Sequence, residues 1–77
     1  MEIKIYVKDR CPQCMMTERL FDQLDCTFEV INITHDEAAQ QRLLQEGWLS
    51  LPVVMVEPDG ISWSGFQPNN IKKVAGN

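Results

Sequence analysis

A strand pattern that gives way, after a short loop, to a helix pattern most constrains how this chain can fold. Residues 2–7 alternate apolar with polar side chains, which is the periodicity of a strand with one buried face. Residues 12–24 place apolar side chains four positions apart, which predicts a helix with a buried stripe of Met16, Leu20 and Leu24, flanked by Phe21. Pro12 suits the first turn of that helix, because its missing N–H would have no helical partner.

The remaining segments continue the series of strands and helices. Residues 27–33 are rich in β-branched side chains and predict a second strand. Thr34 and Glu37 match a capping box, which opens a second helix through residues 36–46 that Gly47 can end. The apolar faces of this helix and of a last helix, which begins at Pro68, are expected to comprise Ala39, Leu43 and Leu44, and Ile71, Val74 and Ala75.

Between these two helices the sequence predicts a hairpin. Its strands are "PVVMV" and "ISW", and "EPDG" between them supplies proline and glycine at the second and fourth positions of a turn. The predicted order is β-α-β-α-β-β-α in a single domain over residues 1–77, because a chain of this size has room for one core. The first half is a parallel βαβ unit and the second an antiparallel hairpin with a packed helix. This is the thioredoxin-type α/β layout, a four-stranded mixed sheet flanked by three helices.

Charge and hydropathy exclude several classes of function. The net charge of −4 and the pI of about 4.7 argue against a nucleic-acid surface, which needs clustered Lys and Arg. No stretch has the roughly 20 apolar residues of a membrane span, and the first residues do not form a secretory signal. We therefore expect a cytoplasmic monomer in a reducing compartment, where lasting structural disulfides are uncommon.

Two of the three cysteines stand where a thiol can be reactive. "CPQC" at residues 11–14 follows a strand and opens a helix, so Cys11 would lie at the helix N-terminus, where free N–H groups and the helix dipole favour an anion. Lys8 and Arg10 add positive charge nearby, which predicts a lowered pKa for Cys11. Cys11 would attack the disulfide of a substrate protein, and the less exposed Cys14 would resolve the mixed disulfide.

Three other interpretations of the cysteine pair remain open. A zinc site needs four ligands, and only Cys26 and His35 stand outside the pair, both far from familiar ligand spacings, so no metal is expected. An inert buried dithiol and a permanent structural disulfide are the other two. Cys26 itself is expected to be a small buried or half-buried thiol, and His35, in the first turn of the second helix, to be solvated.

A second informative position is Pro52, at the mouth of a predicted strand. A proline there cannot donate a ladder hydrogen bond, so it either simply begins the strand or is locked in cis beside the dithiol. In the second case backbone groups of Leu51 would face a docking peptide, which could add as a short strand.

Together, "CPQC" at 11–14, "LPVV" at 51–54 and "WSGFQP" at 63–68 resemble the NrdH-redoxins, small glutaredoxin-like proteins with thioredoxin-like activity. The resemblance implies a thioredoxin fold, Cys11 as attacking and Cys14 as resolving thiol, and a cis Pro52. It also implies electron donation to the large subunit of class Ib ribonucleotide reductase. Thioredoxin reductase would restore the dithiol with its own flavin and NADPH, so this chain would carry no cofactor except the redox-active disulfide. The expected partner-binding residues are Lys8, Pro12, Gln13, Leu51, Pro52, Trp63, Ser64, Gly65 and Phe66.

The closest alternative is a glutathione-dependent glutaredoxin or general protein disulfide reductase. Glutaredoxins usually have a Gly-Gly turn followed by Asp where this chain has "SWSGFQPNN", which favours a protein as reductant. Two positions depart from the NrdH-redoxin pattern: Pro12 stands where Val or Met is frequent, and Gln67 replaces an Arg. Trp63 and Phe66 also have a plainer interpretation as core residues.

Overall fold

The computed structural model describes residues 1–76 and shows seven elements in the predicted order. They are β1 (Glu2–Val7), α1 (Pro12–Gln23), β2 (Glu29–Asn32), α2 (Glu37–Gln45), β3 (Val53–Glu57), β4 (Ile61–Ser64) and α3 (Pro68–Ala75). The strands form one mixed sheet in the order β2-β1-β3-β4, in which β1 pairs in parallel with β2 and antiparallel with β3. The thioredoxin-type layout predicted from the sequence is confirmed.

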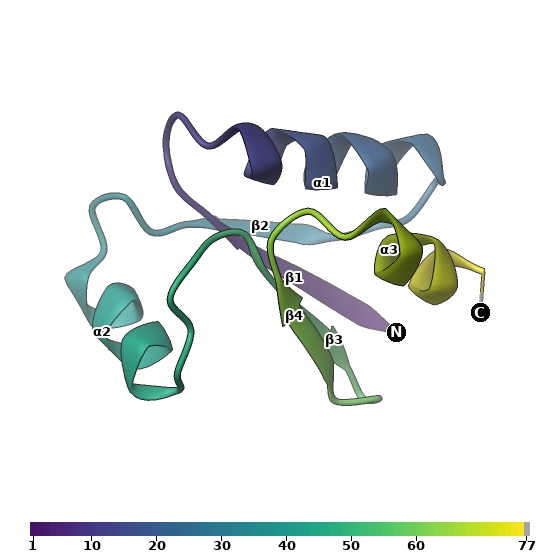
Figure 1. Ribbon diagram of the computed structural model, residues 1–77. Coiled ribbons are helices and arrows are strands. Elements are labelled where there is room, and N and C mark those ends of the chain that lie inside the picture. Colours follow the sequence, from purple (N-terminus) through teal and green to yellow (C-terminus); the bar gives the residue numbers. More distant parts are fainter. Residues whose placement is uncertain (77) are drawn as a thin grey trace.

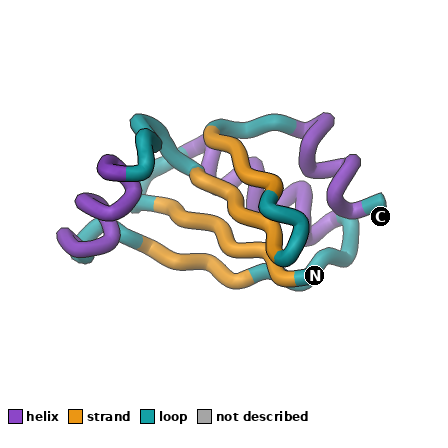
Figure 2. Tube along the Cα trace, turned by 90° about the horizontal axis from the view of Figure 1, so that it is seen from below, coloured by secondary structure: helices purple, strands orange, loops and turns teal. Residues whose placement is uncertain are grey.

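Three helices cover the two faces of the sheet. Figure 1 shows α1 and α3 together on the upper side and α2 at the lower left, and in Figure 2 the strands lie in front of α1, with α3 at the right next to the C-terminus. The larger core lies under α1 and α3 and consists of Ile3, Ile5, Val7, Cys11, Cys14, Phe21, Val54, Val56, Trp63, Ile71 and Val74. A smaller cluster lies under α2 and consists of Ile33, Ala39, Leu43 and Val53. Both cysteines of the motif therefore belong to the main core.

The strand β1 sets the register of the whole sheet. Its buried residues Ile3, Ile5 and Val7 all face the larger core, as the alternation predicted. Ile5 lies opposite Val54 of β3, and these two side chains share that face because partners across antiparallel strands point to the same side. Since β1 ends at Val7 and α1 begins at Pro12, the cysteine pair lies just beyond the C-terminal end of β1.

The buried face of α1 differs from the predicted one. Met16 and Leu24 are exposed, and the buried positions are Cys14, Thr17 and Phe21. Thr17 can be buried because its hydroxyl donates to the backbone carbonyl of Gln13 at 2.8 Å, which removes the cost of an unpaired polar group. Phe21 is buried and Leu20 packs against the main core, as predicted, so the prediction was wrong for Met16 and Leu24 only.

The N-terminus of α2 is capped by a different residue from the one predicted. Asp36 is the N-cap, and its carboxylate accepts from the N–H of Ala39 at 3.1 Å. The capping box of Thr34 and Glu37 is not formed, and Leu44, expected to be buried, is exposed. The end of the helix agrees with the prediction, because Gly47 takes a positive φ of 94° there.

The remaining elements agree with the predictions except in detail. β2 is shorter than the predicted strand, because Phe28 precedes the paired residues and packs against Phe21, with 5.9 Å between ring centroids. The hairpin of β3 and β4 is present, but the N–H of Gly60 donates to Val56 rather than to Glu57, so the turn is one residue longer than predicted. No helix within residues 1–76 has the length and apolar character needed to cross a bilayer.

Candidate active site

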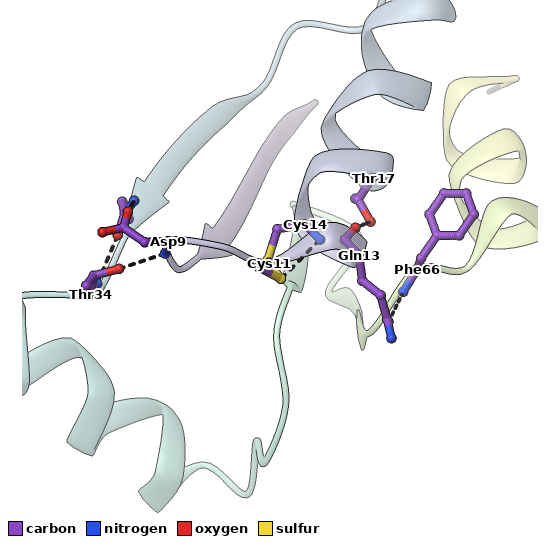
Figure 3. Close-up of a disulfide and its surroundings, with 8 residues drawn as sticks. Asp9, Cys11, Gln13, Cys14, Thr17, Thr34 and Phe66 are labelled. Atoms are coloured by element: carbon purple, nitrogen blue, oxygen red, sulfur yellow. Dashed lines mark hydrogen bonds between the residues drawn. A yellow bond between two sulfur atoms is a disulfide. The ribbon is translucent and has the colours of Figure 1, made fainter.

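The cysteine pair lies at the start of α1, where the strand-loop-helix pattern placed it. Cys11 is the N-cap, Pro12 occupies the first turn, and Cys11 and Cys14 form a disulfide with 5.2 Å between their Cα atoms (Figure 3). The N–H of Cys14 also donates to the sulfur of Cys11 at 3.2 Å. Both residues are buried, and Cys11, at 6% exposed, is slightly more exposed than Cys14, at 1%.

Neither Cys26 nor His35 lies with the pair. Cys26 is a half-buried free thiol whose S–H donates to the carbonyl of Leu24 at 3.8 Å, which confirms the plain interpretation of this residue. His35 is exposed, in the turn that precedes α2 rather than in its first turn. Within residues 1–76, the structure brings together no group of three or more His, Cys, Asp or Glu side chains that could hold a metal ion.

One side of the redox loop is fixed to the neighbouring strand. The N–H of Asp9 donates to the hydroxyl of Thr34 at 2.8 Å, and the amide of Asn32 donates to the carboxylate of Asp9 at 2.9 Å. Asn32 in turn accepts from the N–H of Thr34 at 2.9 Å (Figure 3). The carboxyl ends of the parallel strands β1 and β2 meet here, which brings the two loops together. This network was not predicted from the sequence, although polar residues after two parallel strands were the available signal.

The other side of the redox loop is fixed to the loop between β4 and α3. The side-chain oxygen of Gln13 accepts from the N–H of Phe66 at 3.0 Å (Figure 3). The N–H of Gly65, one residue earlier, donates to the carbonyl of Pro52 at 2.9 Å. The three segments that carry the resemblance therefore meet at one place, beside the disulfide.

Pro52 is buried, and its peptide bond to Leu51 is cis, as the resemblance implied. Leu51 is half-buried and packs against both core clusters, so it lies between the dithiol region and α2. Lys8, Pro12 and Gln13 are exposed around the start of α1. Leu51 also packs against the core cluster to which Cys11 belongs.

Within "WSGFQP" the side chains have different surroundings. Trp63 is 5% exposed and belongs to the main core, and its indole N–H has no hydrogen-bond partner among the described residues. Phe66 is half-buried, so part of its ring remains at the surface. Ser64 accepts from the hydroxyl of Ser50 at 3.3 Å, and its carbonyl accepts from the amide of Gln67 at 2.8 Å. An uncharged residue at 67 therefore still holds this loop.

An apolar groove adjoins the active site on the α2 side. It has a volume of about 250 Å³, and Lys8 and Leu51 form the part nearest to the redox loop. The remaining lining residues are Ile33, Gln40, Leu43, Leu44, Trp48, Leu49 and Ser50. Leu49 is 87% exposed, which is unusual for a large apolar side chain. Of these residues only Lys8 and Leu51 were predicted to belong to the site, although "WLSL" before Pro52 is an apolar run outside any predicted element.

Comparisons with known proteins agree with this geometry. A sequence profile of the glutaredoxin family matches residues 3–61. The glutaredoxin-like protein NrdH of Escherichia coli (strain K12) is 36% identical over 96% of this chain and 89% of its own length, and that of Lactococcus lactis is 27% identical over 95% and 99%. The solved structure of the Escherichia coli NrdH-redoxin superposes with a TM-score of 0.89 over 96% of this chain and 95% of that one. This chain therefore belongs to the glutaredoxin family, and within it to the glutaredoxin-like NrdH-redoxins.

Proposed function

We propose that this protein is a dithiol electron carrier that supplies the large subunit of class Ib ribonucleotide reductase. One observation carries the proposal: in a chain that belongs to the NrdH-redoxins, Cys11 and Cys14 form a disulfide at the N-terminus of α1. A disulfide that spans one helical turn and has one slightly exposed sulfur is suited to repeated opening and closing, because a second thiol is always within reach of the first.

The reaction transfers two electrons in two exchanges. The thiolate of reduced Cys11 attacks one sulfur of the target disulfide, and the other target sulfur leaves as a thiolate that takes up a proton. The thiolate of Cys14 then attacks the sulfur of Cys11, which releases the second target sulfur as a thiol. The target gains two electrons and two protons, and this protein is left with the Cys11–Cys14 disulfide.

The cycle closes when thioredoxin reductase returns two electrons from NADPH through its own flavin. This chain then needs no bound cofactor, and we propose that it acts in the cytoplasm as a monomer. The apolar groove along Leu51 and the half-buried Phe66 support a protein as reductant, because both offer apolar surface on segments that flank the redox loop.

The proposed contact surface for both partners surrounds Cys11. Its outer residues are Lys8, Pro12, Gln13, Leu51 and Phe66, which are exposed or half-buried. Two hydrogen bonds support them: the N–H of Gly65 donates to the carbonyl of Pro52, and the hydroxyl of Ser50 donates to that of Ser64. Trp63 takes part through its packing in the core, because its side chain is buried.

Trapping the mixed disulfide tests the proposal. A Cys14→Ser variant keeps the attacking thiol but cannot resolve the intermediate, so it should form a covalent complex with the large subunit that dithiothreitol releases. Cys11→Ser is the matched control and should trap nothing. Equal trapping by both variants, or trapping by neither, would contradict the assigned roles.

A further inference from the structure

We propose that Gln13 is a positioning residue that selects protein disulfides over small ones, by holding the loop of Phe66 against the start of the redox helix α1. This inference deepens the proposed function, on which it rests. Gln13 lies between the two cysteines, and its side-chain oxygen accepts from the N–H of Phe66 at 3.0 Å. One of the two residues that separate the cysteines is thus bonded to the loop between β4 and α3 (Figure 3).

Gln13 is itself held firmly at its backbone. Its carbonyl accepts from the hydroxyl of Thr17 at 2.8 Å, and Thr17 is fully buried. A side chain that starts from a fixed backbone needs less conformational ordering to hold a hydrogen bond than one on a mobile loop. The position of the Gln13 amide therefore depends on the core of the protein and not on the exposed surface alone.

The loop of Gly65 and Phe66 is held from two sides. The N–H of Gly65 donates to the carbonyl of Pro52 at 2.9 Å, and the next N–H, that of Phe66, donates to Gln13. Without Gln13, the loop would keep its bond to Pro52 but would lose its bond to the redox helix. Phe66 would then lose its defined position relative to Cys11.

The fit between Gln13 and Gly65 is close. Gly65 has a φ of 83°, and a Cβ atom placed on it would lie 3.2 Å from the side-chain oxygen of Gln13. The amide oxygen must face this loop, because the N–H of Phe66 is a donor and needs an acceptor. A carboxylate oxygen at the same place could accept the same bond, which gives a conservative variant for the test.

Positioning Phe66 affects large substrates more than small ones. A protein that docks on the active site must contact surface beyond the sulfur atoms, and a half-exposed aromatic ring is a suitable anchor for it. A small disulfide needs only access to the sulfur of Cys11. Loss of the bond should therefore raise KM for a protein disulfide and affect the reaction with a small disulfide less.

The test uses dithiothreitol as electron source, with insulin as the protein disulfide and hydroxyethyl disulfide as the small one. In Gln13→Leu and Gln13→Asn, which cannot reach Phe66 with an acceptor, KM for insulin should rise about fivefold, the size expected for one lost hydrogen bond. The value of kcat/KM for hydroxyethyl disulfide should fall less than the value for insulin, so that the ratio of the two values decreases in both variants. Gln23→Leu, at the exposed far end of α1, is the matched control and should change neither.

Gln13→Glu supplies the rescue. Its carboxylate can accept from Phe66, so its ratio of insulin to hydroxyethyl disulfide activity should stay near that of the unaltered protein, even if its added charge changes both rates together. Exchange of the Phe66 amide hydrogen should be faster in the Leu and Asn variants and unchanged in Gln13→Glu.

Three results would overturn the inference: an unchanged KM for insulin in the Leu and Asn variants, an equal loss with both substrates, or a Gln13→Glu variant as impaired in its ratio as Gln13→Leu. The assay contains neither ribonucleotide reductase nor thioredoxin reductase. It therefore gives its answer even if the proposed partners prove wrong.

Discussion

The N–H of Gly65 donates to the carbonyl oxygen of Pro52 at 2.9 Å and joins the loop after β4 to the cis-proline loop before β3. This bond fixes two of the three family motifs against each other. Gly65 has a positive φ of 83°, which a residue with a Cβ atom adopts at a cost of about 1–2 kcal/mol. The glycine is thus needed both for its backbone conformation and for its close approach to Gln13.

Replacement of this glycine should reduce both stability and activity. Gly65→Ala should lower the free energy of unfolding by about 1–2 kcal/mol and also impair reduction of insulin, because its Cβ would press on the Gln13 oxygen. Gly47→Ala is the matched control, with a positive φ but no atom within 4 Å of the added carbon. It should lose similar stability in urea titrations and keep its activity. Equal activity of the two variants would show that the contact with Gln13 has no functional weight.

The buried hydroxyl of Thr17 should contribute measurably to stability. Thr17→Val keeps the shape of the side chain but removes the donor to the Gln13 carbonyl, and should cost about 1 kcal/mol of unfolding free energy. Thr27→Val, at an exposed position, is the control and should change little. Urea titration of the oxidised proteins measures both. A Thr17→Val variant as stable as the unaltered protein would mean that the bond has no net value.

Thr34, the predicted cap of α2, and Asp36, the observed one, should have separable effects on stability and on amide exchange. Asp36→Ala removes the N-cap and should lower the unfolding free energy by about 1 kcal/mol. Thr34→Val leaves that cap intact but removes the acceptor of the Asp9 N–H, so it should speed hydrogen exchange at Asp9 more than Asp36→Ala does. Amide exchange and urea titration together distinguish the two. If Thr34→Val lowered the stability and Asp36→Ala did not, Thr34 would be the cap of α2, as predicted from the sequence.

The thiol of Cys11 in the reduced protein should have a pKa below the usual thiol value of about 8.5. The cause is its N-cap position, where helix N–H groups, including that of Cys14, favour the thiolate. A lowered pKa means that the thiolate forms at lower pH, so the rate of disulfide attack should rise with pH earlier than for a free thiol. Titration of the thiolate absorbance in Cys14→Ser measures this pKa. A value at or above that of a free thiol would contradict the proposed role of the helix.

Local patterns were sufficient to predict the order of elements and the placement of the cysteine pair. The alternation of β1, the proline and cysteines at the start of α1, and the glycine after α2 each act within a few residues, so they are visible in the sequence. The resemblance to the NrdH-redoxins added the cis bond before Pro52. Together these features located the candidate site without a structure.

Other features depend on contacts between distant residues. The predicted stripe of Met16, Leu20 and Leu24 and the observed buried set of Cys14, Thr17 and Phe21 both fit a helical period. Only the packing of α1 on the sheet determines which set is buried. The hydroxyl of Thr34 accepts from the N–H of Asp9 and does not cap α2, because β1 and β2 are parallel and end at the same edge of the sheet. The bond from Phe66 to Gln13 spans most of the chain and has no local signal at all. Topology determines these contacts, which is why periodicity could not predict them.

The central claim is that Cys11 and Cys14 carry electrons from thioredoxin reductase to ribonucleotide reductase. The most direct measurement is NADPH oxidation by thioredoxin reductase in the presence of this protein, the class Ib enzyme and a ribonucleotide substrate. The claim predicts oxidation that requires all three proteins, matches the deoxyribonucleotide formed, and disappears in the double variant Cys11→Ser, Cys14→Ser. No electron transfer from thioredoxin reductase, together with efficient reduction of this protein by glutathione, would contradict it and assign the chain to the glutathione-dependent glutaredoxins.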